Sequence, residues 1–351
     1  MSIRRTRPER VAWVDAYKAI AIISVVLGHV FKGNIQVSIT PETMSLQTFG
    51  MDLVYSYHMP LFFMLSGYAY FVFLKRRPNS EIKTNRSVIN LALLYFIYNV
   101  LLSLLKVVFA GFVNNPMQLS DLVRSILLPT TPMWYLYVLL FFYLFFKLIP
   151  DTANQKLWLA LFCFIGIGGR ILLEMWNTPS CIVRFVYYLQ FFWLGGCIDS
   201  LLPEDVRRNS GKKTLLNLLA GLSVVLIIVN WVLLYKGISN VIAGTLCAYG
   251  VIFVLIVIRE KAGRQLSWAP LQYIGKKSLC IYLFHTYVVT ANRYVYRKTS
   301  FVPVYCEIVI GLMVGISVPL TIDYFIGRLS PMLRNLLFQP GKAIATLRGK
   351  V

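Results

Sequence analysis

The sequence has little acidic charge and few of the motifs that mark soluble enzymes. Asp and Glu number 14 against 35 Lys and Arg, and there are only three histidines and six cysteines. The histidines form no HExxH pattern and the cysteines no CxxC pair, so neither a metal site nor a disulfide framework is expected. No glycine-rich phosphate loop and no GxSxG elbow occurs, so P-loop and nucleophile-elbow enzymes are not indicated.

Long apolar runs take the place of these motifs. Hydrophobic residues make up 58% of the 351 positions and charged residues only 14%, a more apolar composition than a soluble core requires. Windows of about 20 apolar residues, the length that crosses a bilayer, predict about ten transmembrane helices. Their approximate ranges are 11–31, 50–74, 87–110, 132–149, 157–174, 181–200, 214–235, 239–258, 273–291 and 302–327. The expected fold class is therefore an all-α polytopic membrane protein.

The same windows predict a single domain. No stretch between two spans is longer than about twenty residues, so residues 1–351 are expected to form one transmembrane domain. The basic start, MSIRRTRPER, is followed by an apolar run that carries charges and has no small-residue cleavage site. We therefore expect the first span to be retained.

Basic residues are distributed unevenly between the two sides of the predicted membrane helices. If the N-terminus is cytoplasmic, 25 of the 35 Lys and Arg fall in segments on that side. This excess predicts that both termini are cytoplasmic, and contact with anionic lipid accounts for the net charge of +21 without a nucleic-acid partner. Eight basic residues are expected on the outer side, namely Lys32, Arg124, Arg170, Arg184, Lys236, Arg293, Arg297 and Lys298, and the remaining two, Lys18 and Lys106, lie within spans.

Ionisable residues inside the first span indicate a functional site. Lys18 and His29 are eleven positions apart, and an eleven-residue step returns to within about 20° of the same helix face, about 16 Å further along the axis. Asp15 falls on the same side. Charged groups inside a membrane are costly and are usually functional. Alternatively, Lys18 snorkels to the inner interface and pairs with Asp15, and His29 is a hydrated interfacial residue.

The second span contains a helix break. Pro60 lies two residues after His58, and a proline breaks or starts a helix, so His58 is expected at an irregular point that lines a cavity. In the alternative reading, the His58 imidazole satisfies backbone groups that Pro60 frees. Ser66 and Gly67 allow a second helix to approach closely.

Further polar and aromatic residues are candidates for supporting roles. Three basic residues, Lys75, Arg76 and Arg77, end the second span on the cytoplasmic side. His285 lies inside an apolar helix and can simply pack there. Glu307 is either an outer-interface carboxylate or the partner of a buried base. Trp134 suits an aromatic belt or sugar stacking.

Several of these segments resemble one family. The segments are WVDAYK and LGH around Lys18 and His29, YHMPLFFMLSGY at 57–68, MWYLYVLLFF at 133–142 and SLCIYLFH at 278–285. Together they resemble the acyltransferase-3 family of integral-membrane O-acyltransferases. The segments VVLGH and HMPLFF are most similar to its fucose 4-O-acetylase-like branch. The resemblance covers the first nine spans. In place of the spaced Arg-x-x-Arg of some members the chain has Lys75-Arg76-Arg77, which leaves open which of the three takes that role.

The resemblance implies an O-acyltransferase of the cytoplasmic (inner) membrane. It implies transfer of an acyl group, usually acetyl, from cytoplasmic acetyl-CoA to a sugar hydroxyl of an exopolysaccharide, lipopolysaccharide or lipid-linked glycan. Acyl-CoA is then a donor substrate, and no permanently bound cofactor or metal is expected.

The resemblance also suggests roles for individual residues. His29 would act as the general base on the sugar hydroxyl, or carry the acyl group in a relay. Lys18, Ser66 or another histidine such as His58 would stabilise the oxyanion. Because Lys18 lies about 16 Å from His29 along the helix, it suits the CoA phosphates or pairing with Asp15 better. The triplet Lys75, Arg76 and Arg77 supplies further candidates for the phosphates, and His285, Glu307 and Trp134 are candidates for supporting or substrate-contacting roles.

A multi-span carrier or flippase for a glycan or small polar substrate is the alternative function. Its intramembrane charges would coordinate a substrate or a proton. A purely structural scaffold would leave Lys18, His29 and His58 unexplained.

Overall fold

The structure of the chain is a computed structural model that describes residues 12–37, 41–76, 78–149, 154–201, 210–262, 268–299 and 303–347. Within these ranges every regular element is a helix. The long helices are α1 (Ala12–Gln36), α4 (Ser80–Val108), α6 (Trp134–Leu148), α7 (Gln155–Met175), α8 (Ser180–Leu201), α10 (Ser210–Tyr235), α11 (Val241–Ala262), α13 (Ser278–Thr299) and α14 (Val304–Leu329). The shorter elements are η1 (Pro41–Thr43), α2 (Met44–Tyr55), α3 (His58–Ala69), η2 (Tyr70–Lys75), α5 (Asp121–Leu127), α12 (Ala269–Lys276), α15 (Pro331–Phe338) and α16 (Pro340–Leu347).

Eight helical segments of the described chain are long and apolar enough to cross a membrane. They are Ala12–Gln36, Met44–Lys75, Ser80–Val108, Gln155–Met175, Ser180–Leu201, Lys213–Tyr235, Val241–Lys261 and Val304–Leu329. The other two predicted spans, 132–149 and 273–291, coincide with the shorter apolar helix α6 and with the α12–α13 pair. The prediction of an all-α polytopic membrane protein is confirmed.

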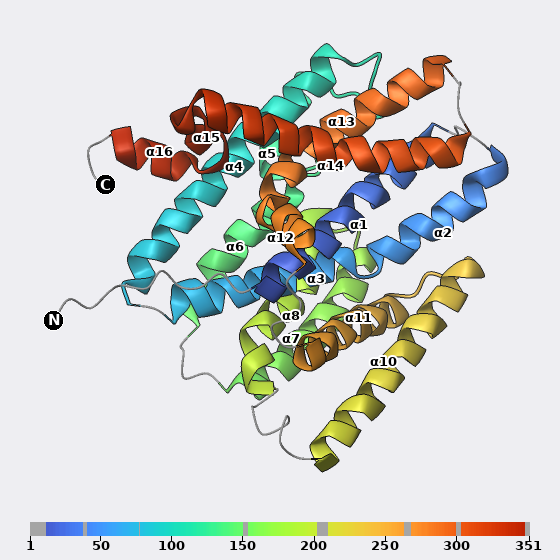
Figure 1. Cartoon of the computed structure of the whole chain (residues 1–351), viewed down its shortest axis with the longest axis vertical. Coiled ribbons are helices and arrows are strands. Elements are labelled where there is room, and N and C mark those ends of the chain that lie inside the picture. The colour runs from blue at the N-terminus through green and yellow to red at the C-terminus, as the bar shows by residue number, and fades with distance from the viewer. Residues whose placement is uncertain are drawn as a thin grey trace.

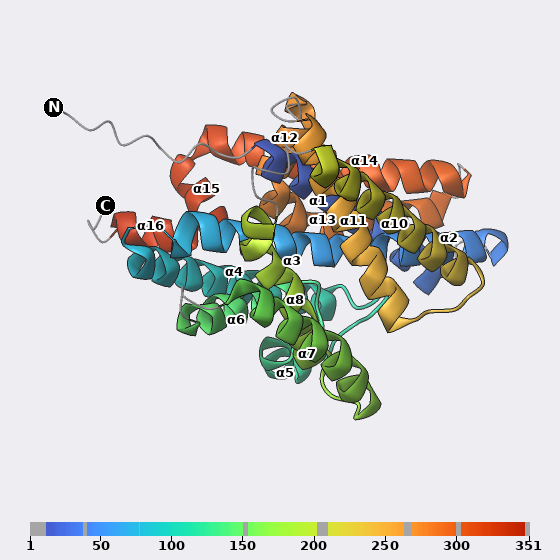
Figure 2. The same cartoon turned by 90° about the horizontal axis from the view of Figure 1, so that it is seen from below.

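Helix α1 lies in the middle of the molecule. It packs between α12, α13 and α14 on one side and α2 and α3 on the other, as both views show (Figures 1 and 2). Its residues are largely buried along the whole length of the helix. Gly275 of α12 lies so close to α1 that a Cβ atom there would sit 1.7 Å from the Asp15 carbonyl oxygen. The helix that carries Lys18 and His29 is therefore enclosed by protein on several sides.

The second predicted span, 50–74, is divided in the structure. Helix α2 ends at Tyr55 and α3 begins at His58, so the break predicted from Pro60 is present and proline occupies the first turn of α3. The segment then continues as the single π-helical turn η2, which ends at Lys75. Such turns are uncommon and often mark functional positions.

Helices α3 and α8 pack with their backbones in close contact through two glycines. A Cβ atom on Gly67 would lie 1.9 Å from the Phe192 carbonyl oxygen, and one on Gly195 would lie 2.0 Å from the Met64 carbonyl oxygen. No larger side chain fits at either position without displacing the backbone of the other helix. The close approach predicted at Gly67 is therefore present, and it fixes α8 against the helix that begins with His58.

Helices α7, α10 and α14 form much of the outer surface. They carry large exposed apolar side chains such as Phe164, Leu218 and Met313, as expected of helices that face lipid. Helices α10 and α11 form a pair at one edge of the molecule (Figure 1).

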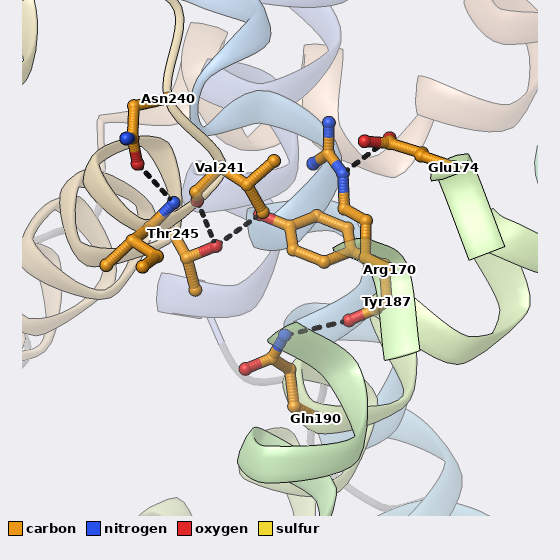
Figure 3. Close-up of polar contacts among 8 residues, drawn as sticks. Arg170, Glu174, Tyr187, Gln190, Asn240, Val241 and Thr245 are labelled. Atoms are coloured by element: carbon orange, nitrogen blue, oxygen red, sulfur yellow. Dashed lines mark hydrogen bonds and ion pairs between the residues drawn. The ribbon is translucent and has the colours of Figure 1, made fainter. Parts of the chain in front are cut away.

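Polar contacts at one end of the bundle connect α8 to the start of α11 (Figure 3). The Tyr187 hydroxyl lies 3.0 Å from Thr245 Oγ1, which donates to the Val241 carbonyl at 2.7 Å. In the same region Arg170 of α7 donates to Glu174 at 2.9 Å and lies over the Tyr187 ring. Arg170 is one of the eight basic residues predicted on the outer side, and its charge is balanced within its own helix.

Candidate active site

One face of α1 lines a cavity near the end of the helix that is predicted to face outside. His29, Lys32, Gly33 and Gln36 line it, and their spacing is that of one helical face. The other walls come from α4 and the segment that follows it, the segment before α6 and the start of α6, α8, and α13. The cavity has a volume of about 570 Å³, within the range of roughly 300–1,000 Å³ that is typical of small-molecule sites. We refer to it as the outer cavity.

Two histidines meet beside the outer cavity. The ring centroids of His29 and His285 are 5.0 Å apart. His29 is partly exposed, whereas His285 is fully buried. His285 Nδ1 lies 2.8 Å from the Tyr282 carbonyl oxygen and 3.0 Å from that of Ile281. Because carbonyl oxygens only accept hydrogen bonds, Nδ1 carries the proton in the neutral ring and Nε2 is the acceptor. The two histidines, which lie in separate predicted spans, therefore form one pair in the structure.

Three consecutive residues of α13 leave buried polar atoms without a partner. They are His285 Nε2, Thr286 Oγ1 and the Tyr287 hydroxyl, none of which has a hydrogen-bond partner in the described protein. Thr286 and Tyr287 also line the outer cavity. Buried polar groups are normally satisfied, so such a run is typical of a site that receives a polar ligand.

The outer cavity is rich in positive charge. Four basic side chains line it, namely Lys32, Lys106, Arg184 and Arg293, whereas none of its described lining residues is Asp or Glu. The Arg184 guanidinium lies over the Trp134 ring, 4.4 Å from its centroid. Trp134 thus lines the cavity and holds a cation there.

Glu307 lies behind the cavity wall and belongs to a buried network. Its carboxylate accepts hydrogen bonds from Asn34 Nδ2 at 2.5 Å and from Asn292 Nδ2 at 3.3 Å. Asn34 Oδ1 in turn accepts from Arg293 Nε at 3.3 Å. The Arg293 guanidinium lies against Gly33, where a Cβ atom would collide with it at 1.9 Å. The carboxylate is therefore connected to the buried Arg293 guanidinium through an asparagine.

His58 is buried at the start of α3 and does not line the outer cavity. Its Nδ1 lies 2.6 Å from the Val54 carbonyl oxygen, at the break between α2 and α3, so it bonds a backbone group beside the break. The Tyr55 ring lies 4.9 Å from the His58 ring and also packs on Gly28, the residue before His29. His58 therefore supports the region next to His29 through Tyr55.

Asp15 and Lys18 lie near the opposite end of α1. Asp15 is 3% exposed, and Lys18 is partly buried. Neither lines the outer cavity. The eleven-residue interval between Lys18 and His29 is helical throughout, which places them about 16 Å apart along the axis. The structure therefore does not bring the lysine to the histidine pair.

The basic residues after η2 bind backbone carbonyls. Lys75 Nζ donates to the Phe146 carbonyl at 2.7 Å and to the Ile149 carbonyl, which satisfies the C-terminal end of α6. Arg76 donates to the Gly196 carbonyl at 3.0 Å. Arg77 lies outside the described residues. Lys75 and Arg76 thus join η2 to α6 and α8.

Ser66 lies within the bundle, away from the outer cavity. Its hydroxyl lies 2.7 Å from the Tyr135 hydroxyl, and both groups are buried. The pair connects α3 to α6. With respect to metal binding, the described ranges contain no group of three or more His, Cys, Asp or Glu side chains placed to hold an ion.

Sequence reasoning missed most of the cavity wall. Lys32, Lys106 and Arg184 were counted as basic residues without a site, and Thr286 and Tyr287 were not singled out. A signal was present for the cations, because Lys32, Arg184 and Arg293 depart from the inside bias and Lys106 lies within a span. Their convergence on one cavity depends on helix packing and cannot be read from spacing along the chain.

A family model described as an acyltransferase domain, the acyltransferase-3 type, matches residues 11–322. No curated protein and no solved structure matches the chain. The matched range begins just before α1 and ends within α14, so it contains every residue of the histidine pair and the cavity wall. The chain therefore belongs to the acyltransferase-3 family and is a multi-pass membrane acyltransferase.

Proposed function

We propose that the chain is an O-acetyltransferase of the cytoplasmic membrane. It transfers an acetyl group from cytoplasmic acetyl-CoA to a hydroxyl of an exopolysaccharide, lipopolysaccharide or lipid-linked glycan. The observation that carries the proposal is the position of His29, on the wall of the outer cavity and beside a second histidine. Membership of an acyltransferase family supports the reaction class, and the site supports the acceptor side of the reaction.

His29 is the general base in this mechanism. A sugar hydroxyl is a poor nucleophile near neutral pH, and a neutral imidazole takes its proton as the oxygen attacks the thioester carbon. The new C–O bond forms, the C–S bond breaks, and the proton on His29 passes to the leaving thiolate. Proton transfer of this kind contributes about 10²–10⁴-fold to the rate.

The donor approaches from the opposite end of α1. Lys18 lies toward the predicted cytoplasmic end, where an ammonium suits the CoA phosphates, with Asp15 three residues away on the same helix. Lys75, Arg76 and Arg77 supply further cations on that side. The thioester must then travel along α1 to reach His29, so the two residues mark the two ends of a transfer path.

The competing function is that of a carrier, and one substitution separates the two. A strain lacking the gene is complemented with the wild-type chain, with His29→Ala, or with Lys236→Gln, which removes an exposed basic residue away from the cavity. Surface glycan from each strain is analysed by NMR and mass spectrometry, and membrane insertion is checked by immunoblot. We expect His29→Ala to insert normally and to lose the O-acetyl groups, and Lys236→Gln to keep them.

Normal acetylation in the His29→Ala strain would disprove the proposed mechanism. The result that would identify a carrier has two parts. The glycan of the wild-type strain carries no O-acetyl group, and export of this unmodified glycan stops in the His29→Ala strain. Isotope-labelled acetyl-CoA added to isolated membranes distinguishes direct use of this donor from use of another acyl-CoA.

A further inference from the structure

The basic residues of the outer cavity form a charge cluster that acyl transfer to a neutral sugar does not require. Of the eight Lys and Arg predicted on the outer side, three line this cavity, and Lys106, which lies within a span, joins them. The four come from α1, α4, α8 and α13, so the fold collects them from four separate helices. Charged side chains at membrane depth are costly, which makes their convergence informative.

Within the part of the chain that the structure describes, three of the four cations have no carboxylate partner. Lys32, Lys106 and Arg184 form no ion pair with any Asp or Glu of the described residues. Lys32 lies close enough to both Arg184 and Lys106 for their charges to repel. Arg293, in contrast, lies near an acid, since Asn34 connects it to Glu307. Mutual repulsion without compensation destabilises the free protein and is relieved when an anion binds.

The cations and His29 line the same cavity. Lys32 follows His29 by three residues on the same face of α1. Thr286 and Tyr287, whose hydroxyl groups have no hydrogen-bond partner among the described residues, line the part of the wall that α13 forms and follow His285 in sequence. A ligand that brings a hydroxyl to His29 therefore places its neighbouring substituents among the ammonium and guanidinium groups.

We propose that the acceptor is an acidic glycan, whose carboxylate or phosphate is bound by Lys32, Lys106 and Arg184 while its hydroxyl lies at His29. This proposal rests on the acyl-transfer function proposed above and adds the substrate class. Arginine recognises planar oxyanions through paired N–H donors, and Arg184 is held for this by stacking on Trp134. Thr286 and Tyr287 suit the uncharged hydroxyls of the same sugar.

The predicted orientation of the helices argues against CoA as the anion. The lining residues of α1, α4 and α13 lie toward the helix ends expected on the outer side, away from the cytoplasm. The CoA phosphates are expected near Lys18, about 16 Å away along α1.

Binding can be tested without any transfer reaction. The full chain is placed in nanodiscs of uncharged lipid, and saturation-transfer NMR is recorded with glucuronate, glucose 1-phosphate and glucose as probes. We expect both acids to bind at least about tenfold more tightly than glucose, with an affinity that falls as salt is raised. A stronger response to glucuronate indicates a carboxylate and a stronger response to glucose 1-phosphate a phosphate. Equal binding of glucose and both acids would overturn the proposal.

Matched variants assign the binding to the outer cavity. The double variant Lys32→Gln/Arg184→Gln should lose the preference for acids, whereas Arg124→Gln, which removes an exposed outer arginine that does not line the cavity, should keep it. The charge-conserving variant Arg184→Lys should retain part of the binding, because it keeps the charge but loses the paired N–H donors, and it shows that the fold persists. An acid preference that survives in the double variant would refute the assignment.

Two further arms separate this proposal from the acyl-transfer mechanism. His29→Ala should still bind the acidic sugars, because the cations are intact, so failure of transfer and failure of anion recognition give different results. Coenzyme A is added as a fourth probe to the double variant. If its affinity falls as much as that of glucuronate does, the cavity holds the donor and the proposal is wrong.

Discussion

The imidazole rings of His29 and His285 face each other across α1 and α13, with their centroids 5.0 Å apart. His285 is fixed by two backbone carbonyls at Nδ1, and its buried Nε2 has no partner among the described residues. No hydrogen bond joins the two rings as they lie here, but a rotation of the His29 ring that brings one of its N–H groups to this atom would satisfy the acceptor and leave the other His29 nitrogen free to act as a base. His285 is in this view a positioning residue for His29.

Two substitutions at His285 separate its two nitrogens. Asparagine places an amide near the Nδ1 position and keeps the donor to the carbonyls, whereas glutamine places one near Nε2. We expect His285→Asn to lower kcat about 10- to 100-fold, as the loss of an orienting partner does, with little change in the KM for acetyl-CoA. His285→Gln should retain more activity than His285→Asn.

The measurement is acetyl transfer in isolated membranes, with the thermal unfolding midpoint as a check on folding. Equal loss of activity in both variants, together with a lowered midpoint, would show that His285 only packs the helix. A KM increase with unchanged kcat would instead place it on the acetyl-CoA side.

Part of this arrangement could be predicted from the sequence and part could not. The apolar windows predicted the membrane helices, and Pro60 predicted the break before α3, because both signals are local. The Lys18 to His29 interval was also readable, since it depends only on helical geometry. The meeting of His29 with His285 joins residues far apart in the chain, and that depends on how α13 packs against α1.

For the basic triplet Lys75, Arg76 and Arg77, the sequence likewise predicted the location of the residues but not their contacts. The position of the triplet after an apolar span predicted cytoplasmic cations, but the π-helical turn η2 directs Lys75 to the end of α6 and Arg76 to α8. A π turn adds a residue to the helical repeat, so side-chain directions beyond it cannot be extrapolated from an ordinary α-helix.

Gly67 provides a direct test of the α3–α8 contact. Gly67→Ala should lower the stability by roughly 1–3 kcal/mol or more, because its Cβ atom would lie 1.9 Å from the Phe192 carbonyl oxygen. Gly221→Ala in α10 is the matched control, since a Cβ atom there meets nothing within 4 Å and alanine favours the helix. Thermal unfolding in detergent should show a drop of several degrees for Gly67→Ala only. The same midpoint in both variants would contradict the close packing of α3 on α8.

A buried acid near the end of α14 should be sensitive to neutralisation. Asp323 is 3% exposed, and its carboxylate pairs with Lys277 and accepts a hydrogen bond from Arg334 Nε at 2.8 Å. The hydrogen bond from Arg334 raises the pKa of the Arg334 guanidinium. Asp323→Asn leaves Lys277 and Arg334 without their acid, and because both cations are partly exposed it should cost about 1.5–3 kcal/mol.

Glu81→Gln serves as the control for Asp323→Asn. It breaks the exposed pair with Lys147 at 3.2 Å and should cost about 1 kcal/mol or less. Chemical denaturation of the two purified variants measures both values. Similar losses of stability would mean that the Asp323 cluster is no more important than a surface pair.

Neutralising Lys75 and neutralising Lys18 should affect different properties of the protein, namely its stability and its KM for acetyl-CoA. Lys75→Gln removes donors from the carbonyls of Phe146 and Ile149, so the unfolding midpoint should fall by a few degrees, since a hydrogen bond from a charged donor contributes about 1.5–3 kcal/mol. Lys18→Gln removes the ammonium assigned to the CoA phosphates and should raise the KM for acetyl-CoA about tenfold, the effect of losing one charge-assisted contact. Initial rates at varied acetyl-CoA, with the acceptor glycan held constant, measure the second effect. An unchanged KM in Lys18→Gln would remove Lys18 from the donor path and leave it as a structural residue at the cytoplasmic end of α1. A raised KM for acetyl-CoA with an unchanged response to acceptor concentration would assign the two ends of this helix to the two substrates.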